Sequence, residues 1–285
     1  MFSASALLLV LQFAFAASAW AAQPKVVATI FPLASWLAEL TEDTAEVEQL
    51  LPAGANPHMF EPPPAQVRAL SQAILLVTVG AGLDDWAGKI AVAAGGNLHV
   101  LRLADRVPLL PLTGEQGRDP HFWLDPILVR DHVMPALTDA LARVAPQHAG
   151  AHAARARQWS EELSRLDERL RQELAPVRGR AYIAVHSAWR YFAHRYGLVE
   201  AATVEPVPGR ELSAKEMIAL VEQVRRSGAR ALIVEPYVFS KVASQIAAET
   251  GIRLVTVDPF GGGALHGGYI RLMEANARAF VEALR

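Results

Sequence analysis

The stretch Val26-Val-Ala-Thr-Ile30-Phe-Pro-Leu33-Ala-Ser-Trp-Leu-Ala-Glu-Leu40 predicts a buried β-strand that leads directly into a helix. Its first half is a short run of β-branched and apolar residues, and its second half places apolar residues at helical spacing. The same alternation recurs along the chain, which is typical of an α/β fold with parallel sheets covered by helices. The further strand and helix pairs are Val47–Leu51 with Ala65–Ser71, Ile74–Val79 with Asp84–Ala94, Ala181–Val185 with Trp189–Tyr196, Ala231–Val234 with Lys241–Thr250, and Leu254–Val257 with Tyr269–Leu284.

One segment without a strand candidate, Pro146–Val177, separates the two sets of pairs. It is rich in Ala, Arg, Glu, Gln and Leu, and apolar residues such as Trp159, Leu163 and Leu166 recur at helical spacing. A single helix of roughly 28 residues would be about 42 Å long, which is the size of a domain. We therefore expect a long helix that joins two lobes. An amphipathic helix inside one large domain is the alternative.

This organisation divides the chain into four parts. Residues 1–21 are expected to be a signal peptide, residues 22–145 an N-terminal α/β lobe, residues 146–178 the linking helix, and residues 179–285 a C-terminal α/β lobe. A second helix in the C-terminal lobe has clear end signals, because Ser213 and Glu216 form a capping box and Gly228 follows the last turn.

The export signal rests on the apolar run Ala6–Ala22. Ala19 and Ala21 satisfy the A-x-A cleavage rule, which places cleavage after Ala21. Lys and Arg are absent from Met1–Leu7, although a charged segment is usual there, so the true start codon stays open. The alternative is a membrane anchor, but the run is shorter than the roughly 20 residues of a typical span. We expect a periplasmic protein.

The composition excludes several functional classes. The 27 Lys and Arg residues nearly balance the 29 Asp and Glu residues, and 52% of the chain is hydrophobic, as in ordinary globular proteins. Without a strong basic surplus, nucleic acid is not an expected partner. The chain has no cysteine, which rules out disulfides, thiolate zinc sites and a lipid-modified cysteine.

Three of the nine histidines occur in settings that suit a metal ligand. His58 lies in a proline-rich loop, where fixed φ angles would hold the imidazole before an ion arrives. His121 lies between two Asp-Pro pairs, and His186 directly follows the buried-strand candidate that ends at Val185. Ligands of parallel sheets gather outside the carboxyl ends of the strands.

A fourth candidate ligand is Asp258, which also follows a strand. Two candidates then come from each half of the chain, as expected for an ion bound between two lobes. Three imidazoles and one carboxylate suit a tetrahedral divalent ion, and Zn²⁺ is the usual occupant of such a set. The alternative is that each histidine is an ordinary hydrogen-bonded residue and that the Asp-Pro pairs are only turns.

Several ordered motifs resemble one protein family, the zinc and manganese branch of the periplasmic solute-binding proteins that serve ABC transporters. The resemblance extends from about Lys25 to Arg285. It implies two (β/α) lobes joined by a long helix, and metal ligands at His58, His121, His186 and Asp258. The motifs are Gly54-Ala-Asn-Pro-His58-Met-Phe-Glu61-Pro, Asp119-Pro-His121 with Trp123-Leu-Asp125-Pro126, His186-Ser-Ala-Trp-Arg-Tyr191-Phe192, Glu235-Pro, and Asp258-Pro-Phe-Gly261.

The chain departs from the family pattern at three places. The segment Leu112–Asp119 is short and lacks the histidine-rich loop of many zinc members, so scavenging of ions by a loop is not expected. His186 stands where manganese members usually have Glu, which favours zinc. Arg190 stands where the family more often has a small residue. Because its charge would oppose a cation, we expect a partner among Glu205, Glu211 and Glu235.

The resemblance implies a periplasmic Zn²⁺-binding protein, monomeric and without enzymatic activity, that delivers its ion to an inner-membrane ABC permease. A periplasmic metallochaperone is a further possible partner. Glu61, Glu235 and Arg190 are candidates for groups that surround the ligands. Three alternatives stay open: the same fold binding Mn²⁺ or Fe²⁺, a secreted zinc hydrolase with Glu61 or Glu235 as general base, and a metal-containing adhesin.

Overall fold

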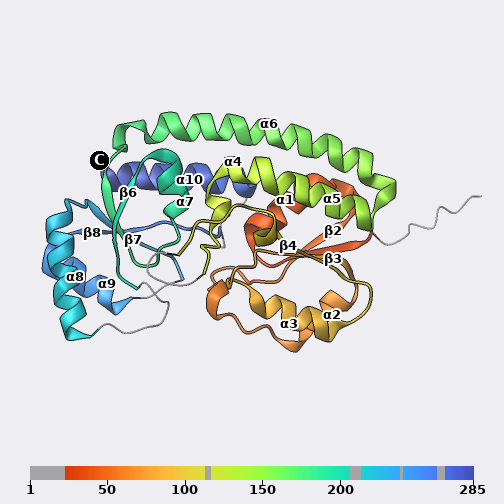
Figure 1. Cartoon of the computed structure of the whole chain (residues 1–285), viewed down its shortest axis with the longest axis horizontal. Coiled ribbons are helices and arrows are strands. Elements are labelled where there is room, and N and C mark those ends of the chain that lie inside the picture. The colour runs from red at the N-terminus through yellow and green to blue at the C-terminus, as the bar shows by residue number, and fades with distance from the viewer. Residues whose placement is uncertain (1–22, 113–116, 206–212, 238–239, 262–266) are drawn as a thin grey trace, which may run out of the picture.

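The computed structural model describes residues 23–112, 117–205, 213–237, 240–261 and 267–285. Two four-stranded sheets form two lobes, and every strand pair within them is parallel. Figure 1 shows the lobes side by side beneath one long helix. The α/β class with two lobes and a linking helix is therefore confirmed. The signal peptide predicted for residues 1–21 lies outside the described residues.

The N-terminal sheet has the strand order β2-β1-β3-β4. The chain passes from β1 to its neighbour β2 on one side, and β3 then pairs with β1 on the opposite side. The strand order therefore reverses between β1 and β3, and ligands of such folds bind at this switch point. The strands are β1 (Lys25–Ala28), β2 (Glu46–Gln49), β3 (Ala73–Thr78) and β4 (His99–Arg102), and the helices of this lobe are α1 (Phe31–Thr41), α2 (Pro64–Ser71) and α3 (Asp85–Ala94).

The C-terminal sheet repeats this order as β6-β5-β7-β8. The capping box between Ser213 and Glu216 is present at the start of α8, and Gly228 ends that helix with a φ of 66°. The strands are β5 (Ala181–Ala184), β6 (Val199–Thr203), β7 (Ala231–Val234) and β8 (Arg253–Thr256), and the helices are α7 (Arg190–Tyr196), α8 (Ala214–Ser227), α9 (Lys241–Thr250) and α10 (Gly268–Leu284).

Two strands, β4 and β6, were not expected from the sequence. Both are edge strands with partly exposed residues, and so neither reads as a continuous apolar run. The helical segment formed by α4 (Pro126–Leu128), the π-helical turn η5 (Val129–Val133) and α5 (Met134–Val144) was also not expected. It packs against the long helix.

The long helix is α6 (Ala149–Leu174), which has 26 residues. It contacts α5 and α1 on the side of the N-terminal lobe, and α10 and α7 on the other side. Leu37 of α1, Leu163 of α6 and Phe280 of α10 belong to one hydrophobic cluster. The two lobes therefore share a core along α6.

An ion-pair network adds to this connection. Asp167 of α6 accepts hydrogen bonds from Arg195 of α7 at 2.6 and 2.8 Å and from Arg171 at 2.9 Å. Such charge-assisted, bidentate contacts define geometry better than a single pair. They tie the long helix to the segment that follows β5.

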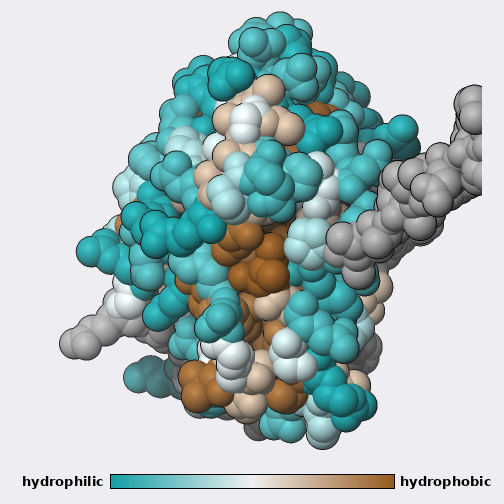
Figure 2. All heavy atoms as spheres, turned by 90° about the vertical axis from the view of Figure 1, so that its right-hand side faces the viewer, coloured by the Kyte–Doolittle hydropathy of each residue, from teal (hydrophilic) through white to brown (hydrophobic). Residues whose placement is uncertain are grey.

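The end of the molecule formed by the N-terminal lobe is mostly hydrophilic, with apolar side chains gathered in a central band (Figure 2). Among the described residues, no helix combines the length and the hydrophobicity that crossing a lipid bilayer requires.

Candidate metal centre

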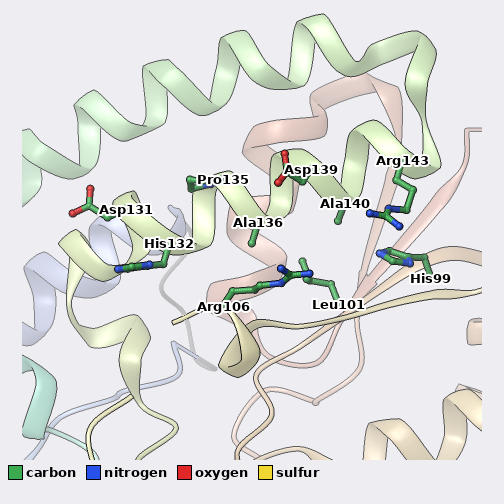
Figure 3. A pocket seen from close by; sticks show the side chains of 10 residues that line it. All are labelled: His99, Leu101, Arg106, Asp131, His132, Pro135, Ala136, Asp139, Ala140 and Arg143. Atoms are coloured by element: carbon green, nitrogen blue, oxygen red, sulfur yellow. The ribbon is translucent and has the colours of Figure 1, made fainter. Parts of the chain in front are cut away.

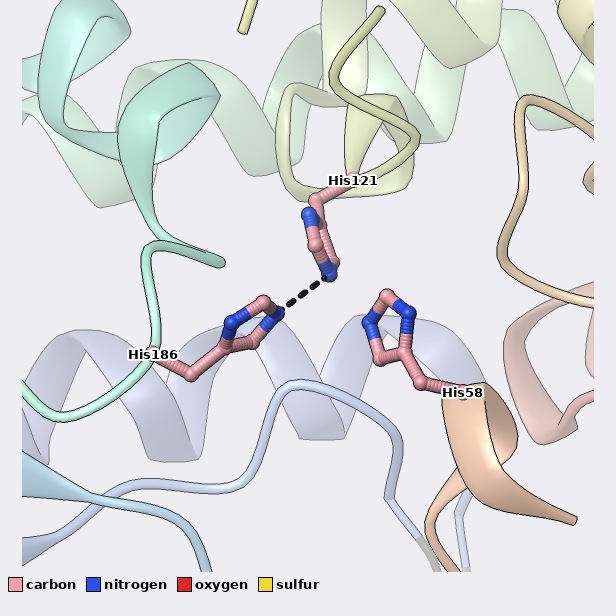
Figure 4. A group of neighbouring side chains, drawn as sticks. All are labelled: His58, His121 and His186. Carbon is pink, nitrogen blue, oxygen red and sulfur yellow. Dashed lines mark hydrogen bonds between the residues drawn. The ribbon is translucent and has the colours of Figure 1, made fainter. Parts of the chain in front are cut away.

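Three histidines from separate segments converge where the two lobes meet (Figure 4). His58 lies in the 3₁₀ turn η2 (Pro57–Met59), His121 precedes the 3₁₀ turn η4 (Phe122–Leu124), and His186 follows β5 after one residue. Each offers a ring nitrogen, and these three atoms lie within 4.8 Å of one another. The structure therefore brings together three of the four ligands expected from the sequence.

The spacing of the nitrogens suits a tetrahedral ion. The Nε2 atoms of His121 and His186 are 3.3 Å apart. Two nitrogens bound to Zn²⁺ at about 2.0–2.1 Å, at a tetrahedral angle, are separated by about 3.3–3.4 Å. The ring of His58 lies 5.6 Å from that of His121 and 5.0 Å from that of His186, measured between centroids. Its Nε2 atom is buried and makes no hydrogen bond with the described residues.

The loop that bears His58 is held by its own sequence. The Asn56 side chain accepts a hydrogen bond from the His58 amide at 2.9 Å. The indole N–H of Trp86, in α3, donates to the Pro57 carbonyl at 3.0 Å, and the Phe60 ring packs edge-on against Trp86. These contacts fix the loop to α3, so that His58 is positioned in the metal-free protein.

His121 is oriented by Asp119, which sequence reasoning missed. The Asp119 carboxylate is fully buried and lies 2.8 Å from Nδ1 of His121. An ionised carboxylate only accepts hydrogen bonds, so Nδ1 carries the proton and Nε2 presents its lone pair to the other histidines. Asp119 was interpreted as part of an Asp-Pro turn. A carboxylate two residues before a candidate ligand was the signal that could have found it.

Arg190 pairs with Asp119 rather than with the expected partners Glu205 or Glu235 among the described residues. Nη1 of Arg190 lies 3.3 Å from the second oxygen of Asp119 and donates to the Pro111 carbonyl at 2.7 Å. Glu211 lies outside the described residues. One Asp119 oxygen thus contacts His121, and the other compensates the positive charge of Arg190.

The segment after β5 is held by Glu200, another residue that the sequence did not single out. This buried carboxylate accepts hydrogen bonds from Ser187 at 2.5 Å, from Tyr182 at 3.0 Å and from Thr203 at 3.0 Å. Ser187 is the residue next to His186. The network thereby fixes the backbone that carries the third histidine.

Burial disfavours the protonated form of two of the three histidines. It lowers the pKa of His58 to about 3, and the positive charge of a protonated His121 acts in the same direction. Burial likewise lowers the pKa of His186 well below 6.5, with contributions from His121 and His58. Neutral imidazole is the form that binds a metal ion, so these two ligands need not release protons near neutral pH.

Asp258, the fourth expected ligand, does not belong to the converging group among the described residues. One of its oxygens accepts hydrogen bonds from the amides of Phe260 and Gly261, both at 2.9 Å. The Phe260 ring lies 6.5 Å from that of His121. The Asp258 loop thus reaches the site through Phe260, and coordination by its carboxylate stays a prediction.

The two other carboxylates singled out from the sequence differ in environment. Glu235 follows β7 and is buried, which raises its pKa to about 8, and the neighbouring Asp258 charge adds to this effect. Its Oε1 atom has no hydrogen-bond partner in the described part of the chain. Glu61 is exposed and lines an outer groove beside His58.

Aromatic side chains cover the site on the side of the long helix. Trp123 lies 5.2 Å from the His121 ring and donates to the Pro259 carbonyl at 2.8 Å, which links the two lobes. Tyr191 donates to the Asp119 carbonyl at 2.9 Å. Trp189 and Phe192 instead pack on Phe280 in the core.

Known proteins resemble this chain over most of its length. The family model described as "Zinc-uptake complex component A periplasmic" (ZnuA) matches residues 26–283. The "High-affinity zinc uptake system protein ZnuA" of Paracoccus denitrificans is 28% identical, over 92% of both chains. The "Manganese-binding lipoprotein MntA" of Halalkalibacterium halodurans is 26% identical, over 91% of this chain and 88% of that protein. A crystal structure of a ZnuA deletion mutant with zinc bound superposes with a TM-score of 0.82 at 29% identity, covering 92% of this chain and 98% of the other.

Proposed function

The chain belongs to the ZnuA family of periplasmic zinc-uptake components, and we propose that it captures one Zn²⁺ ion with His58, His121 and His186. The observation that carries this assignment is the convergence of three imidazoles from both lobes, with two Nε2 atoms at 3.3 Å. The ion is the cargo of the protein. Asp258 completes the coordination, once its carboxylate turns from the amides of Phe260 and Gly261.

Zinc is favoured over manganese by the donor set. Imidazole suits Zn²⁺, whereas carboxylate and carbonyl oxygens suit Mn²⁺. The family includes a manganese-binding relative, so the metal is decided by the ligands of each chain. Three histidines and at most one carboxylate place this chain with the zinc members.

Delivery is the second part of the proposal. Proteins of this family work with ABC permeases, and their described location is the periplasm. We assign residues 1–21 to an export signal. An inner-membrane permease receives the ion from this protein. A periplasmic metallochaperone is the candidate that supplies the ion beforehand. The protein acts as a monomer. Release needs only a small displacement of one ligand loop, because the shared core along α6 resists a wide opening of the lobes.

We infer that the site is not catalytic, because Asp258 as fourth ligand would fill the coordination shell. Catalytic zinc keeps a position open for water, whereas four protein ligands leave none. The relatives are named for metal uptake and binding. Of the two general bases considered for a hydrolase, Glu61 is exposed and Glu235 is buried.

The test is a metal titration of the chelator-stripped protein. We expect one equivalent of Zn²⁺ to bind tightly and an excess of Mn²⁺ to leave it in place. The His186→Ala variant should lose most of this affinity, whereas His194→Ala, which changes an exposed histidine of α7, should keep it. Equal affinity in both variants would show that the three-histidine site is not the binding site.

A further inference from the structure

A second group of nitrogen-bearing side chains lines a groove of about 420 Å³ in the N-terminal lobe. The groove runs between α5 with the preceding turn η5 on one side and the edge strand β4 on the other (Figure 3). Its volume lies in the range of small-molecule sites. None of the three converging histidines lines it. Four basic side chains do so: Arg106, Arg143, His99 and His132.

The described part of this groove carries two arginines and two aspartates, and no ion pair joins them. Among the described residues, neither Arg106 nor Arg143 forms an ion pair. Both acidic residues, Asp131 and Asp139, line the groove. Asp131 is held by Arg130 at 2.7 and 3.1 Å, and Figure 3 shows the Asp139 side chain directed away from Arg106.

Small side chains line the α5 side of the groove. Ala136 and Ala140 of α5 face the groove, and they leave space where Arg106 and Arg143 extend from its two walls. Arg143 acts on the facing imidazole, because the pKa of His99 is lowered by partial burial and further by the Arg143 charge. An anion in this space would contact both guanidinium groups.

The backbone before α5 supports a ligand role. His132 belongs to the π-helical turn Val129–Val133, a rare conformation that recurs at functional sites. This turn comes directly before the helix that carries Ala136, Ala140 and Arg143. The irregularity thus coincides with a histidine that lines one end of the groove (Figure 3).

We propose that this groove binds a multiply charged oxyanion, carrying phosphate or carboxylate groups, between Arg106 and Arg143. Guanidinium groups match the two oxygens of such groups with paired hydrogen bonds, and His99, which faces Arg143, supplies a further donor. A free soluble oxyanion and the headgroup of an anionic lipid share this chemistry. The site is independent of the zinc site.

The test uses the metal-free full protein at low ionic strength, in three arms: inorganic phosphate, citrate, and vesicles containing phosphatidylglycerol. Binding is followed by calorimetry for the soluble anions and by co-sedimentation for the vesicles. The double variant Arg106→Gln with Arg143→Gln should bind at least ten-fold more weakly. The double Lys variant should bind with intermediate affinity, since it keeps the charge and loses the paired hydrogen bonds. Arg157→Gln, which removes an exposed arginine of α6, is the control.

Saturable binding of one soluble anion per chain, weakened in the double Gln variant alone, supports the proposal with a soluble ligand. Binding to vesicles without binding of soluble anions supports it with a lipid headgroup. The proposal is overturned when no arm shows binding, or when Arg157→Gln weakens binding as much as the double variant. Zinc titration of the double Gln variant, expected to match the parent protein, keeps this test separate from that of the metal site.

Discussion

The Asp119 carboxylate lies 2.8 Å from Nδ1 of His121, and this contact decides which nitrogen of the imidazole faces the other two histidines. The same carboxylate is contacted by Arg190 at 3.3 Å. One buried acid thereby orients a ligand and neutralises the nearest permanent positive charge. The candidate metal site consequently depends on a residue that need not touch the ion.

Replacement of Asp119 by Asn should weaken zinc binding. The amide cannot supply the negative charge that holds the His121 proton on Nδ1, so we expect a loss of about 10–100-fold in affinity. Competition with a chromophoric chelator measures this change. Asp131→Asn, which alters an exposed acid paired with Arg130, should have no effect. Equal zinc affinity of Asp119→Asn and the parent protein would remove Asp119 from the site.

Replacement of Asp258 by Asn tests the fourth ligand. If the carboxylate completes the tetrahedron, the variant should bind zinc roughly ten-fold more weakly or worse, while the three histidines still hold the ion. The visible spectrum of the Co²⁺-substituted protein should change as well, since a ligand is exchanged. An unchanged spectrum and affinity would mean that another group or water fills the fourth position.

Acid should destabilise the metal-free protein in a defined direction. The pKa values of His58 and His186 are lower in the folded state than the 6.5 of an unfolded chain, so the unfolded state binds more protons below pH 6.5. Stability contributed by these groups is complete above pH 6.5 and declines as the pH falls toward about 3. Urea titrations of the chelator-treated protein between pH 7.5 and 4.5 measure the slope. A double variant, His58→Asn with His186→Asn, should show a shallower slope than the parent.

The pH dependence of zinc affinity should follow the pKa values of the same histidines. Because the pKa of His58 in the metal-free protein is about 3, proton competition at this ligand begins well below pH 6.5. We therefore expect zinc affinity to change little between pH 7.5 and 6.5 on account of His58. The zinc affinity, measured at each pH with the free zinc concentration held constant, checks this expectation. A ten-fold fall over that interval, traced to His58 by its substitution, would contradict the low pKa.

Removal of Asp167 should loosen the connection between the long helix and α7. Its carboxylate is buried and accepts hydrogen bonds from Arg195 at 2.6 and 2.8 Å. Asp167→Ala leaves Arg195 with only the longer contact to Asp125 at 3.7 Å and should cost about 2 kcal/mol of unfolding free energy. Glu162→Ala breaks the exposed pair with Arg165 and should cost less than about 0.5 kcal/mol. Chemical denaturation of both variants in the zinc-free state measures the difference in unfolding free energy. Equal losses would show that the Asp167 contacts do not stabilise the fold.

Sequence patterns were sufficient for the elements that are buried on both faces. The runs around Val26, Ile183 and Leu232 read as strands because such strands carry apolar residues without interruption. The long helix was predicted because a helix of that length repeats its apolar positions many times. The edge strands β4 and β6 were missed, because His99, Arg102 and Glu200 interrupt their apolar residues.

For the site, the sequence by itself singled out His58, His121 and His186, because each stands in a stiff loop or at a strand end. Only the tertiary structure decided that their nitrogens meet, and that Asp119 rather than a glutamate faces Arg190. The physical reason is that local sequence determines backbone conformation over a few residues, whereas a contact between residues 119 and 190 depends on how two lobes pack along α6. Sequence spacing carries no record of that packing.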